Sequence, residues 1–246
     1  MNEKEIYENW SETPNEFRDD LIKFHDWFDK TDSIRSTISQ GHIDFHTKIL
    51  TSEVYGIIGD VREKNCLEIG FGGGRLLNAA SSIFENVTGV DIHSCFDITE
   101  KFLKTQGVTN FSLFHYDNIE KIQNNHIDFI FSFIVFQHFN SIKTFSDYID
   151  FIHRVLKNDG CCKIYFGINQ WNTEDFYLKN DIERKTNCST LFYNPNFVKN
   201  ELIKKGFDII SMGQTRKTPW SSMMSGQFYV TFRKHQLCFE KNEKIV

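Results

Sequence analysis

The sequence predicts an α/β fold built on a doubly wound, mostly parallel sheet. From Asn65 onward, short apolar runs alternate with amphipathic segments of helical period, a pattern typical of βαβ units. The first of these runs leads directly into the glycine-rich segment 70–74, and a segment of helical composition follows. A strand, a tight turn and a helix are therefore expected in this order, with the turn at the sheet edge where open α/β folds bind ligands.

Seven apolar runs have the length and composition of strands. The last two alternate apolar and polar residues, and the segment between them carries the turn residues Pro219 and Ser221. These two strands are expected to form an antiparallel hairpin at the sheet edge. A long amphipathic helix is expected at 141–156, closed by a turn at 158–160. The expected strands are 66–69, 87–90, 111–115, 127–133, 161–167, 207–211 and 227–233.

The residues before the first strand are expected to be helical. Thr13, followed by Glu16 three residues later, predicts a capping box and the start of a helix. A second helix is predicted at about 42–58 from its apolar periodicity. Residues 1–60 are therefore expected to form a helical extension or lid on a domain that spans 61–246, within one compact unit.

Composition limits the classes of partner. The chain has 246 residues, of which 40% are hydrophobic, enough for one large core. It carries 28 Lys and Arg against 33 Asp and Glu, a net charge of −5, and so lacks the positive excess that drives attachment to nucleic acid. No apolar run approaches the roughly 20 residues of a membrane-spanning helix. We expect a small, uncharged or cationic substrate, and neither a nucleic-acid nor a membrane partner.

The cysteines and histidines do not predict a metal site. The six cysteines have neither CxxC spacing nor a regular framework, and no signal peptide is recognised, so reduced thiols in a cytoplasmic protein are expected. His42 and His46 are spaced to share a helix face, but no third ligand is identifiable. The sequence leaves the oligomeric state open.

The glycine-rich turn has the features of a nucleotide site. Gly70, Gly72 and Gly74 permit a tight turn and a close approach of a ligand to the backbone, and the helix that follows presents free N–H groups. Asp91 comes about 20 residues later, after the second strand, where a carboxylate can bind the two hydroxyls of a ribose. Arg75 occupies the third glycine position of the dinucleotide fingerprint, which disfavours NAD and FAD.

The motifs resemble those of a known family. Residues 68–74 read Glu-x-Gly-x-Gly-x-Gly and residues 89–91 read Gly-Val-Asp, which together resemble motifs I and II of the class I S-adenosylmethionine (SAM) dependent methyltransferases. The resemblance extends in order across roughly 65–232. It implies a seven-stranded sheet with an antiparallel last strand, SAM as cofactor and S-adenosylhomocysteine (SAH) as product.

The resemblance also implies which residues hold SAM. The glycine loop and the carboxylate before it would hold the methionine part, and the carboxylate after the second strand would bind the ribose. The next residue would cover the adenine, two residues after the third strand would meet its nitrogens, and the end of the fourth strand would offer backbone contacts. In chain order, these residues are Glu68, Gly70, Gly72, Gly74, Asp91, Ile92, Asp117, Asn118 and Phe133.

His138 is the candidate general base. It follows the fourth strand on the ligand-binding rim, and an imidazole can accept a proton near neutral pH. This favours oxygen of a metabolite or sugar derivative as the methyl acceptor, although the same histidine could instead support the loop or the cofactor. Five aromatic side chains are candidates for the acceptor site and its cover, namely Tyr7, Trp10, Trp171, Tyr193 and Trp220.

Two other functions stay open at this stage. One is a nicotinamide-dependent oxidoreductase on a similar open sheet, against which Arg75 argues. The other is a non-catalytic member of the methyltransferase fold that acts as a partner subunit, because a fold does not fix a function.

Overall fold

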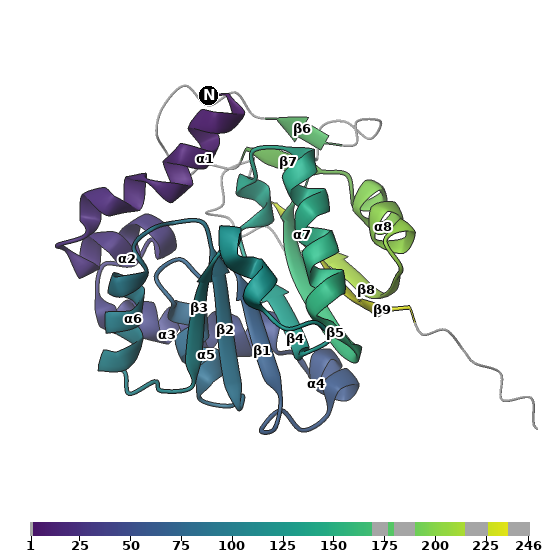
Figure 1. The fold of residues 1–246 in the computed structure, drawn as a ribbon, viewed down its shortest axis with the longest axis horizontal. Coiled ribbons are helices and arrows are strands. Elements are labelled where there is room, and N and C mark those ends of the chain that lie inside the picture. The colour runs from purple at the N-terminus through teal and green to yellow at the C-terminus, as the bar shows by residue number, and fades with distance from the viewer. Residues whose placement is uncertain (1, 169–176, 180–189, 215–225, 236–246) are drawn as a thin grey trace, which may run out of the picture.

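The computed structural model describes residues 2–168, 177–179, 190–214 and 226–235. A seven-stranded sheet has the order β3-β2-β1-β4-β5-β9-β8 (Figure 1). Strands β1 to β5 are parallel to one another, and β9 runs antiparallel between β5 and β8. The predicted mostly parallel sheet of seven strands is therefore confirmed. Its strands are β1 (Asn65–Ile69), β2 (Asn86–Asp91), β3 (Phe111–His115), β4 (Ile127–Ser132), β5 (Leu156–Gly167), β8 (Phe207–Gln214) and β9 (Gln227–Lys234).

Helices cover both faces of the sheet. Apolar side chains of α7 and α8 pack on one face, and those of α3 to α6 pack on the other (Figure 1). A small second sheet pairs β6 (Tyr177–Lys179) with β7 (Leu191–Tyr193). The α-helices are α1 (Glu3–Ser11), α2 (Leu21–Asp29), α3 (Ile34–Asp44), α4 (Ser52–Ile58), α5 (Arg75–Ser81), α6 (Phe96–Thr105), α7 (Ile142–Val155) and α8 (Pro195–Lys204). Shorter helical turns are η1 (Thr13–Phe17), η2 (Phe45–Ile49), η3 (Tyr116–Lys121) and η4 (Phe136–His138).

The first helix begins earlier than the sequence analysis predicts. The capping box is formed by Asn2 and Glu5, whose side chains each accept a hydrogen bond from the other's backbone, and α1 follows. The capping box expected at Thr13 is wrong, because only the short turn η1 forms there and no side chain caps it. Helix α2 begins instead after Asp20, whose carboxylate accepts a hydrogen bond from the backbone of Lys23. Asn2 and Thr13 both begin a polar-x-x-Glu pattern, and of these two only Asn2 forms a capping box.

The helix predicted at 42–58 is interrupted. Helix α3 passes into the π-helical turn η2, the chain leaves the helical region at Leu50 with ψ of 71°, and α4 then begins after Thr51. Phe45 and Val54 are nevertheless both fully buried. The apolar period therefore continues across the break, which explains why the sequence pattern did not reveal it.

The chain passes from α7 into β5 without the predicted turn. Leu156 already pairs with Ile127, and the next paired residue is Cys161, opposite Phe129. The expected turn at 158–160 therefore lies within an irregular part of the strand, where extra residues bulge out of the ladder.

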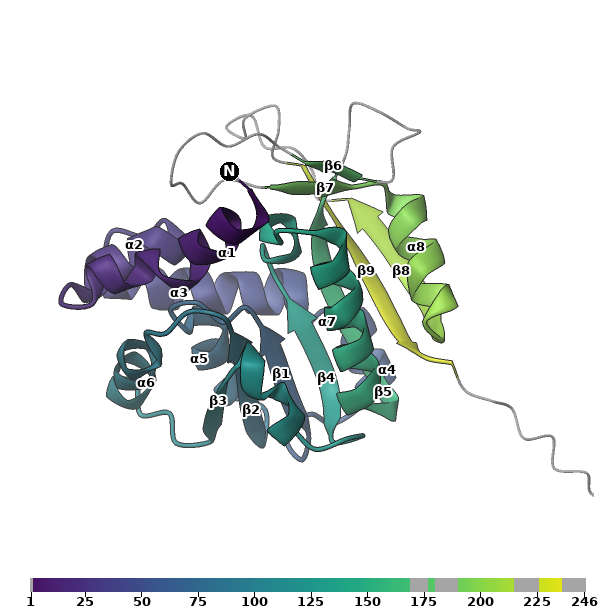
Figure 2. The same ribbon diagram turned by 45° about the horizontal axis from the view of Figure 1, so that its top comes forward.

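Helix α1 lies across the edge of the sheet at which the parallel strands end (Figures 1 and 2). The amide of Asn140, after β4, donates a hydrogen bond to the carbonyl of Glu3 at 3.2 Å. Asn15, in η1, exchanges hydrogen bonds with the hydroxyl of Ser94 after β2. The N-terminal segment thus bridges the loops that follow β4 and β2.

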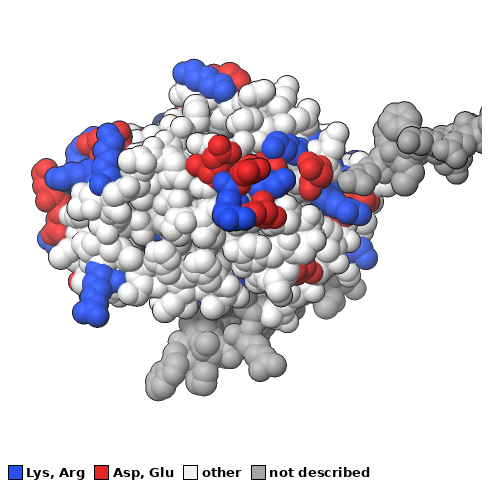
Figure 3. Space-filling view, turned by 90° about the horizontal axis from the view of Figure 1, so that it is seen from below, with Lys and Arg blue, Asp and Glu red and all other residues white. Residues whose placement is uncertain are grey.

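Charged side chains of both signs are mixed at the opposite edge of the molecule (Figure 3). Asp128, near the start of β4, is 2.9 Å from the ammonium of Lys157 and 3.4 Å from that of Lys64. Within the described ranges, no helix combines the length and apolar character needed to cross a membrane.

We expect Phe45→Ala to loosen the helical extension from the sheet. The ring is fully buried and its centre is 5.4 Å from that of Phe131 in β4. Deleting such a ring costs about 3–5 kcal/mol of the free energy of unfolding, measured by urea titration. The neighbouring Ile43→Ala is the control, because Ile43 is 54% exposed and its loss should change stability by less than about 0.5 kcal/mol. Equal losses for the two variants would contradict this packing.

Candidate functional site

The glycine loop lies at the carboxyl end of β1 in a conformation that favours glycine. Gly70, Gly72 and Gly74 have φ of +76°, +48° and +86°. A Cβ on Gly70 would collide with the side chain of Val135, and one on Gly72 would come within 2.8 Å of the ring of Phe28. The loop is therefore enclosed by the segment after β4 on one side and by α2 on another.

Asp91, the last residue of β2, holds this loop in place. Its Oδ2 accepts a hydrogen bond from the backbone of Gly72 at 2.8 Å, and its Oδ1 accepts one from Ile92 at 2.7 Å. Oδ1 accepts a second hydrogen bond from the backbone of His93 at 3.4 Å, so the acceptor capacity that is left for a ligand hydroxyl lies on Oδ2. Ile92 is half-buried beside it.

His93, which the sequence analysis did not select, contacts the glycine loop through the carbonyl of Gly72. The ring is fully buried; its Nδ1 accepts a hydrogen bond from the backbone of Cys95, so its Nε2 donates to the carbonyl of Gly72 at 3.1 Å. Burial lowers the pKa of His93, which outweighs the opposing effect of Asp91 and keeps the ring neutral. No spacing rule marks a histidine at this position as part of a glycine loop.

Arg75 ties the loop to the N-terminal helices. Its Nε is 2.7 Å from Oδ1 of Asp29 in α2, and its Nη1 is 2.7 Å from Oδ2 of Asp44 in α3. Lys48 adds a second cation 2.6 Å from Asp44. Burial raises the pKa of Asp44, but the charge of Arg75 and hydrogen bonds from Lys48 and Gln40 outweigh it and hold the pKa below its ordinary value. Arg75, which replaces the third glycine of the dinucleotide fingerprint, thus fixes α2 and α3 to the glycine loop through ion pairs.

Helix α2 packs directly on the same loop. Phe28 covers Gly72, and the imidazole of His25 lies where a side chain on Gly73 would be. His25 is also hydrogen-bonded to Asp29, with 3.2 Å between Nδ1 and Oδ2. Together with the Arg75 ion pairs, these contacts make α2, α3 and the glycine loop one packed unit.

Glu68 presents a buried carboxyl group to this unit. The residue is 2% exposed, and burial raises its pKa well above the ordinary value despite the opposing charge of Arg75. Its Oε2 has no hydrogen-bond partner among the described residues. A buried polar atom without a partner in the protein is uncommon and fits a ligand that carries a hydrogen-bond donor or a positive charge.

Asp117 and Asn118 lie in η3, directly after β3. The side chain of Asp117 is 73% exposed and its Oδ2 is 3.4 Å from Nδ1 of His115, and Asn118 accepts a hydrogen bond from Lys121 at 2.9 Å. Burial and, after it, the negative charges of Asp117, Glu12 and Asp91 raise the pKa of Tyr7 in α1. The structure thus gathers Tyr7, Asp91 and Asp117 at one edge.

The end of β4 is strained. Phe133 is 7% exposed and its ring centre lies 5.0 Å from the ammonium of Lys48 and 5.8 Å from the guanidinium carbon of Arg75. The next residue, Ile134, has φ of +62°, which is unfavourable for a β-branched residue, and its side chain is 39% exposed. Such strain gathers at functional sites, and nothing in the sequence marked Ile134.

His138 lies in η4 under the N-terminal helix. Its ring centre is 4.4 Å from that of Trp10 in α1, with 45° between the planes. The amide nitrogen of Gln137 is 3.4 Å from its Nε2. Trp10 is also 5.9 Å from Trp27 of α2. The structure therefore brings together His138 and Trp10, two of the residues that the sequence analysis selected.

Tyr7 and Tyr193 are the other selected aromatic residues that the structure describes. Tyr193 is fully buried in the core, where its hydroxyl donates a hydrogen bond to the carbonyl of Phe136 at 2.9 Å. Trp171 and Trp220 lie outside the described residues.

The thiols and imidazoles form no metal cluster in the part of the chain that the structure describes. The rings of His42 and His46 are stacked with 6.0 Å between their centres. Four buried cysteines are free thiols, namely Cys66, Cys95, Cys161 and Cys162.

Comparison with known proteins agrees with this geometry. Residues 67–164 match the family model of the methyltransferase domain. This segment of the chain is therefore a methyltransferase domain. The matched segment includes the glycine loop, Asp91 and His138. No curated protein sequence is significantly similar to the chain.

Solved structures of methyltransferases share the fold at low identity. A SAM-dependent methyltransferase from Methanosarcina mazei is 16% identical with a TM-score of 0.61, over 76% of this chain and 99% of that one. The 1,6-didemethyltoxoflavin-N1-methyltransferase of Burkholderia thailandensis, solved with 1,6-didemethyltoxoflavin and SAH, is 16% identical with a TM-score of 0.61, over 91% of each chain. The [4+2]-cyclase SpnF is 14% identical with a TM-score of 0.58, over 76% of this chain and 80% of that one.

We expect Arg75→Met to destabilise the protein by about 3–5 kcal/mol at neutral pH, because the buried carboxylate of Asp29 loses the guanidinium and that of Asp44 keeps only Lys48. Adding Asp29→Asn and Asp44→Asn should recover most of the loss in urea titrations. Arg62→Met, at a fully exposed ion pair with Asp60, is the control and should leave stability unchanged.

The pH dependence provides a second test of this ion-pair cluster. Because the folded-state pKa of Asp44 is depressed, its contribution to stability is present above the unfolded pKa and is lost as the pH falls through the folded pKa. The gap between the native chain and Arg75→Met should therefore narrow below about pH 4. A gap that stays constant down to pH 2.5–3 (roughly a unit below the ordinary value) would contradict the assignment.

Proposed function

We propose that this methyltransferase moves the methyl group of SAM to an oxygen of a small molecule, a metabolite or a sugar derivative. The observation that carries the proposal is the buried Glu68 carboxyl with an unpartnered Oε2. It lies beside a glycine loop whose backbone Asp91 fixes by accepting a hydrogen bond from Gly72. SAM, when bound, supplies an electrophilic methyl group. The rest is binding, alignment and the exclusion of water by residues of this chain.

The binding roles follow from the positions of the residues. Glu68 would meet the ammonium group of the methionine part, and charge pairing there would favour its ionised form. The acceptor capacity that is left on Oδ2 of Asp91 suits a ribose hydroxyl. The backbone of Gly70, Gly72 and Gly74 lies at the carboxyl end of β1, where its N–H and carbonyl groups would meet the methionine part.

The remaining binding residues lie around the same edge. Ile92 is half-buried next to the ribose carboxylate and would cover the adenine. Asp117 and Asn118 follow β3 and would meet its nitrogens, whereas Phe133 would contribute backbone contacts, because its side chain is buried beneath Lys48 and Arg75.

His138 is the proposed general base. An imidazole near the end of β4 can take the proton of a hydroxyl as its oxygen attacks the methyl group. Trp10 lies against this ring, so the seating of α1 would fix the orientation of the base. A small acceptor agrees with the Burkholderia relative, which was solved with a small molecule as its acceptor and covers nearly the whole of this chain.

Within residues 1–60, α1 and η1 are the part that we propose to act as a lid. Helices α2 and α3 are fixed to the glycine loop through Arg75, whereas α1 and η1 are joined to the domain through hydrogen bonds of exposed or half-buried groups such as Asn140 and Asn15. Helix α1 carries Tyr7 and Trp10. Its departure would open the site, and its return would exclude water from the reacting atoms.

We expect SAM and SAH, but not NAD, to raise the melting temperature of the purified protein. A ligand at about 100 times its Kd adds roughly 2.7 kcal/mol, which at about 2–4 °C per kcal/mol is a clear shift for a chain of this size. Asp91→Asn should weaken SAH binding about 10- to 100-fold, because a charged acceptor is lost. Asp150→Asn is the matched control, since Asp150, on α7, forms an ion pair with Lys205 at the surface. A shift with NAD alone would favour an oxidoreductase instead.

We expect His138→Ala to lower methyl transfer by about 10²- to 10⁴-fold, the usual range for a general base. The measurement is SAH formation with an acceptor selected from a library of hydroxylated metabolites. The SAH-induced rise in melting temperature should be unchanged. The activity of the native chain should fall at acid pH as the base becomes protonated, and the variant should lack this fall. Full turnover by the variant would limit His138 to support of the loop. No transfer by the native chain, despite SAH binding, would favour a non-catalytic partner subunit or a reaction other than methyl transfer.

A further inference from the structure

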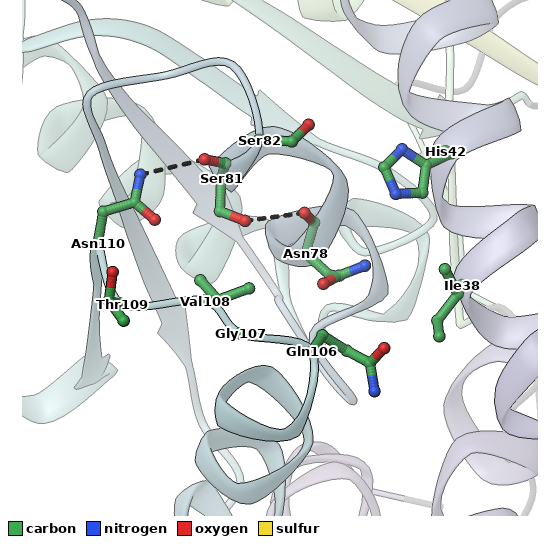
Figure 4. A pocket seen from close by; sticks show the side chains of 10 residues that line it. All are labelled: Ile38, His42, Asn78, Ser81, Ser82, Gln106, Gly107, Val108, Thr109 and Asn110. Atoms are coloured by element: carbon green, nitrogen blue, oxygen red, sulfur yellow. Dashed lines mark hydrogen bonds between the residues drawn. The ribbon is translucent and has the colours of Figure 1, made fainter.

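A second pocket lies away from the glycine loop. It measures about 630 Å³ and lies between α3, the end of α5 and the loop from α6 to β3 (Figure 4). This volume is within the range of small-molecule sites, roughly 300–1,000 Å³. Helix α5 begins at the glycine loop and ends at this pocket, so the two sites lie at opposite ends of one helix.

The pocket contains a buried amide without a protein partner. Asn78 is 8% exposed, and its side chain forms no hydrogen bond with the described part of the chain. Figure 4 shows its carboxamide pointing into the space between His42 and Gln106. Its Nδ2 and Oδ1 are not sealed from solvent, so both are open to a ligand that enters the pocket.

The neighbouring polar groups differ from Asn78, because the protein already satisfies them. The hydroxyl of Ser81 donates to the carbonyl of Asn78 at 2.8 Å, and that of Ser82 donates to Ala79 at 2.7 Å. The amide of Asn110 donates to three backbone carbonyls, the first of them that of Ser81. These groups shape the wall, and the side-chain hydrogen-bonding capacity that is left includes that of Asn78, Gln106, His42 and Thr109.

The lining selects an uncharged ligand. No Lys, Arg, Asp or Glu is among its residues. Burial, and to a lesser degree His46, lowers the pKa of His42, so its ring is neutral at pH 7. Ile38 and Val108 add apolar surface. A charged group would therefore lose its hydration without gaining a partner of opposite charge.

We propose that this pocket is a second binding site, for a planar, uncharged molecule that presents a hydrogen-bond donor beside an acceptor. A carboxamide offers a donor and an acceptor in one plane, and pairs in a bidentate manner with a group of the same kind, as Asn and Gln do with adenine. Asn78 supplies the buried partner and Gln106 the second, while the apolar surface contacts the flat part of the ligand.

Three isosteric probes test the site, namely benzamide, benzoate and benzamidine, which are neutral, anionic and cationic. Binding to the full chain is followed by NMR chemical shifts with the cofactor site saturated by SAH. Benzamide should bind saturably at millimolar concentration, and the two charged probes at least about tenfold more weakly. Asn78→Leu and, separately, the half-buried Gln106→Ala should each weaken benzamide binding by a similar factor.

The outcomes separate this proposal from the proposed methyltransferase activity. The SAH-induced melting shift should persist in both variants, which also shows that they fold. Absence of saturable benzamide binding, equal binding of the charged probes, or benzamide binding that neither variant changes would each overturn the second site, whatever the cofactor experiments give.

Discussion

The buried ion pairs of Arg75 with Asp29 and Asp44 determine how the rest of the site is built. They join three segments that are far apart in sequence, at the point where the glycine loop becomes α5. Removing three charges from water is costly, and a buried pair gives little net stability compared with apolar packing. The cluster instead fixes the positions of α2 and α3, because both carboxylates can reach the same guanidinium only if these helices lie against the loop. The N-terminal helices are thereby part of the proposed cofactor site.

The glycine loop is shaped as much by its neighbours as by its own residues. Val135 fills the space beside Gly70, and Phe28 fills the space beside Gly72. Asp91 and His93 hold the loop through its backbone, one through the N–H and the other through the carbonyl of Gly72. A loop fixed from several sides presents its remaining backbone groups to a ligand without further rearrangement, which reduces the entropic cost of binding.

The fold alone does not decide the reaction. The [4+2]-cyclase SpnF has the same fold as the methyltransferases from Methanosarcina and Burkholderia. Function therefore has to be argued from the site. Here the deciding features are the chemistry around Glu68 and Asp91 and the contact between His138 and Trp10, which joins the proposed base to the helix that covers the site.

Local pattern determined the sheet, the glycine loop and the acid that follows it. Each of the seven strands overlaps one of the expected apolar runs, and the positions of Glu68 near the end of β1 and of Asp91 at the end of β2 follow from that pattern. Strand period and turn chemistry depend only on residues that are close in sequence, so these features can be predicted from each segment by itself.

Tertiary structure decided the rest. Asn2 with Glu5, and Thr13 with Glu16, are equivalent capping signals, and only the packing of the segment selects the first. The partners of Arg75 are 46 and 31 residues away in sequence, and Tyr193, which looks like a site residue, is fully buried in the core. These outcomes depend on which distant side chains meet and on which groups lose contact with water, and no pattern within a single segment records either.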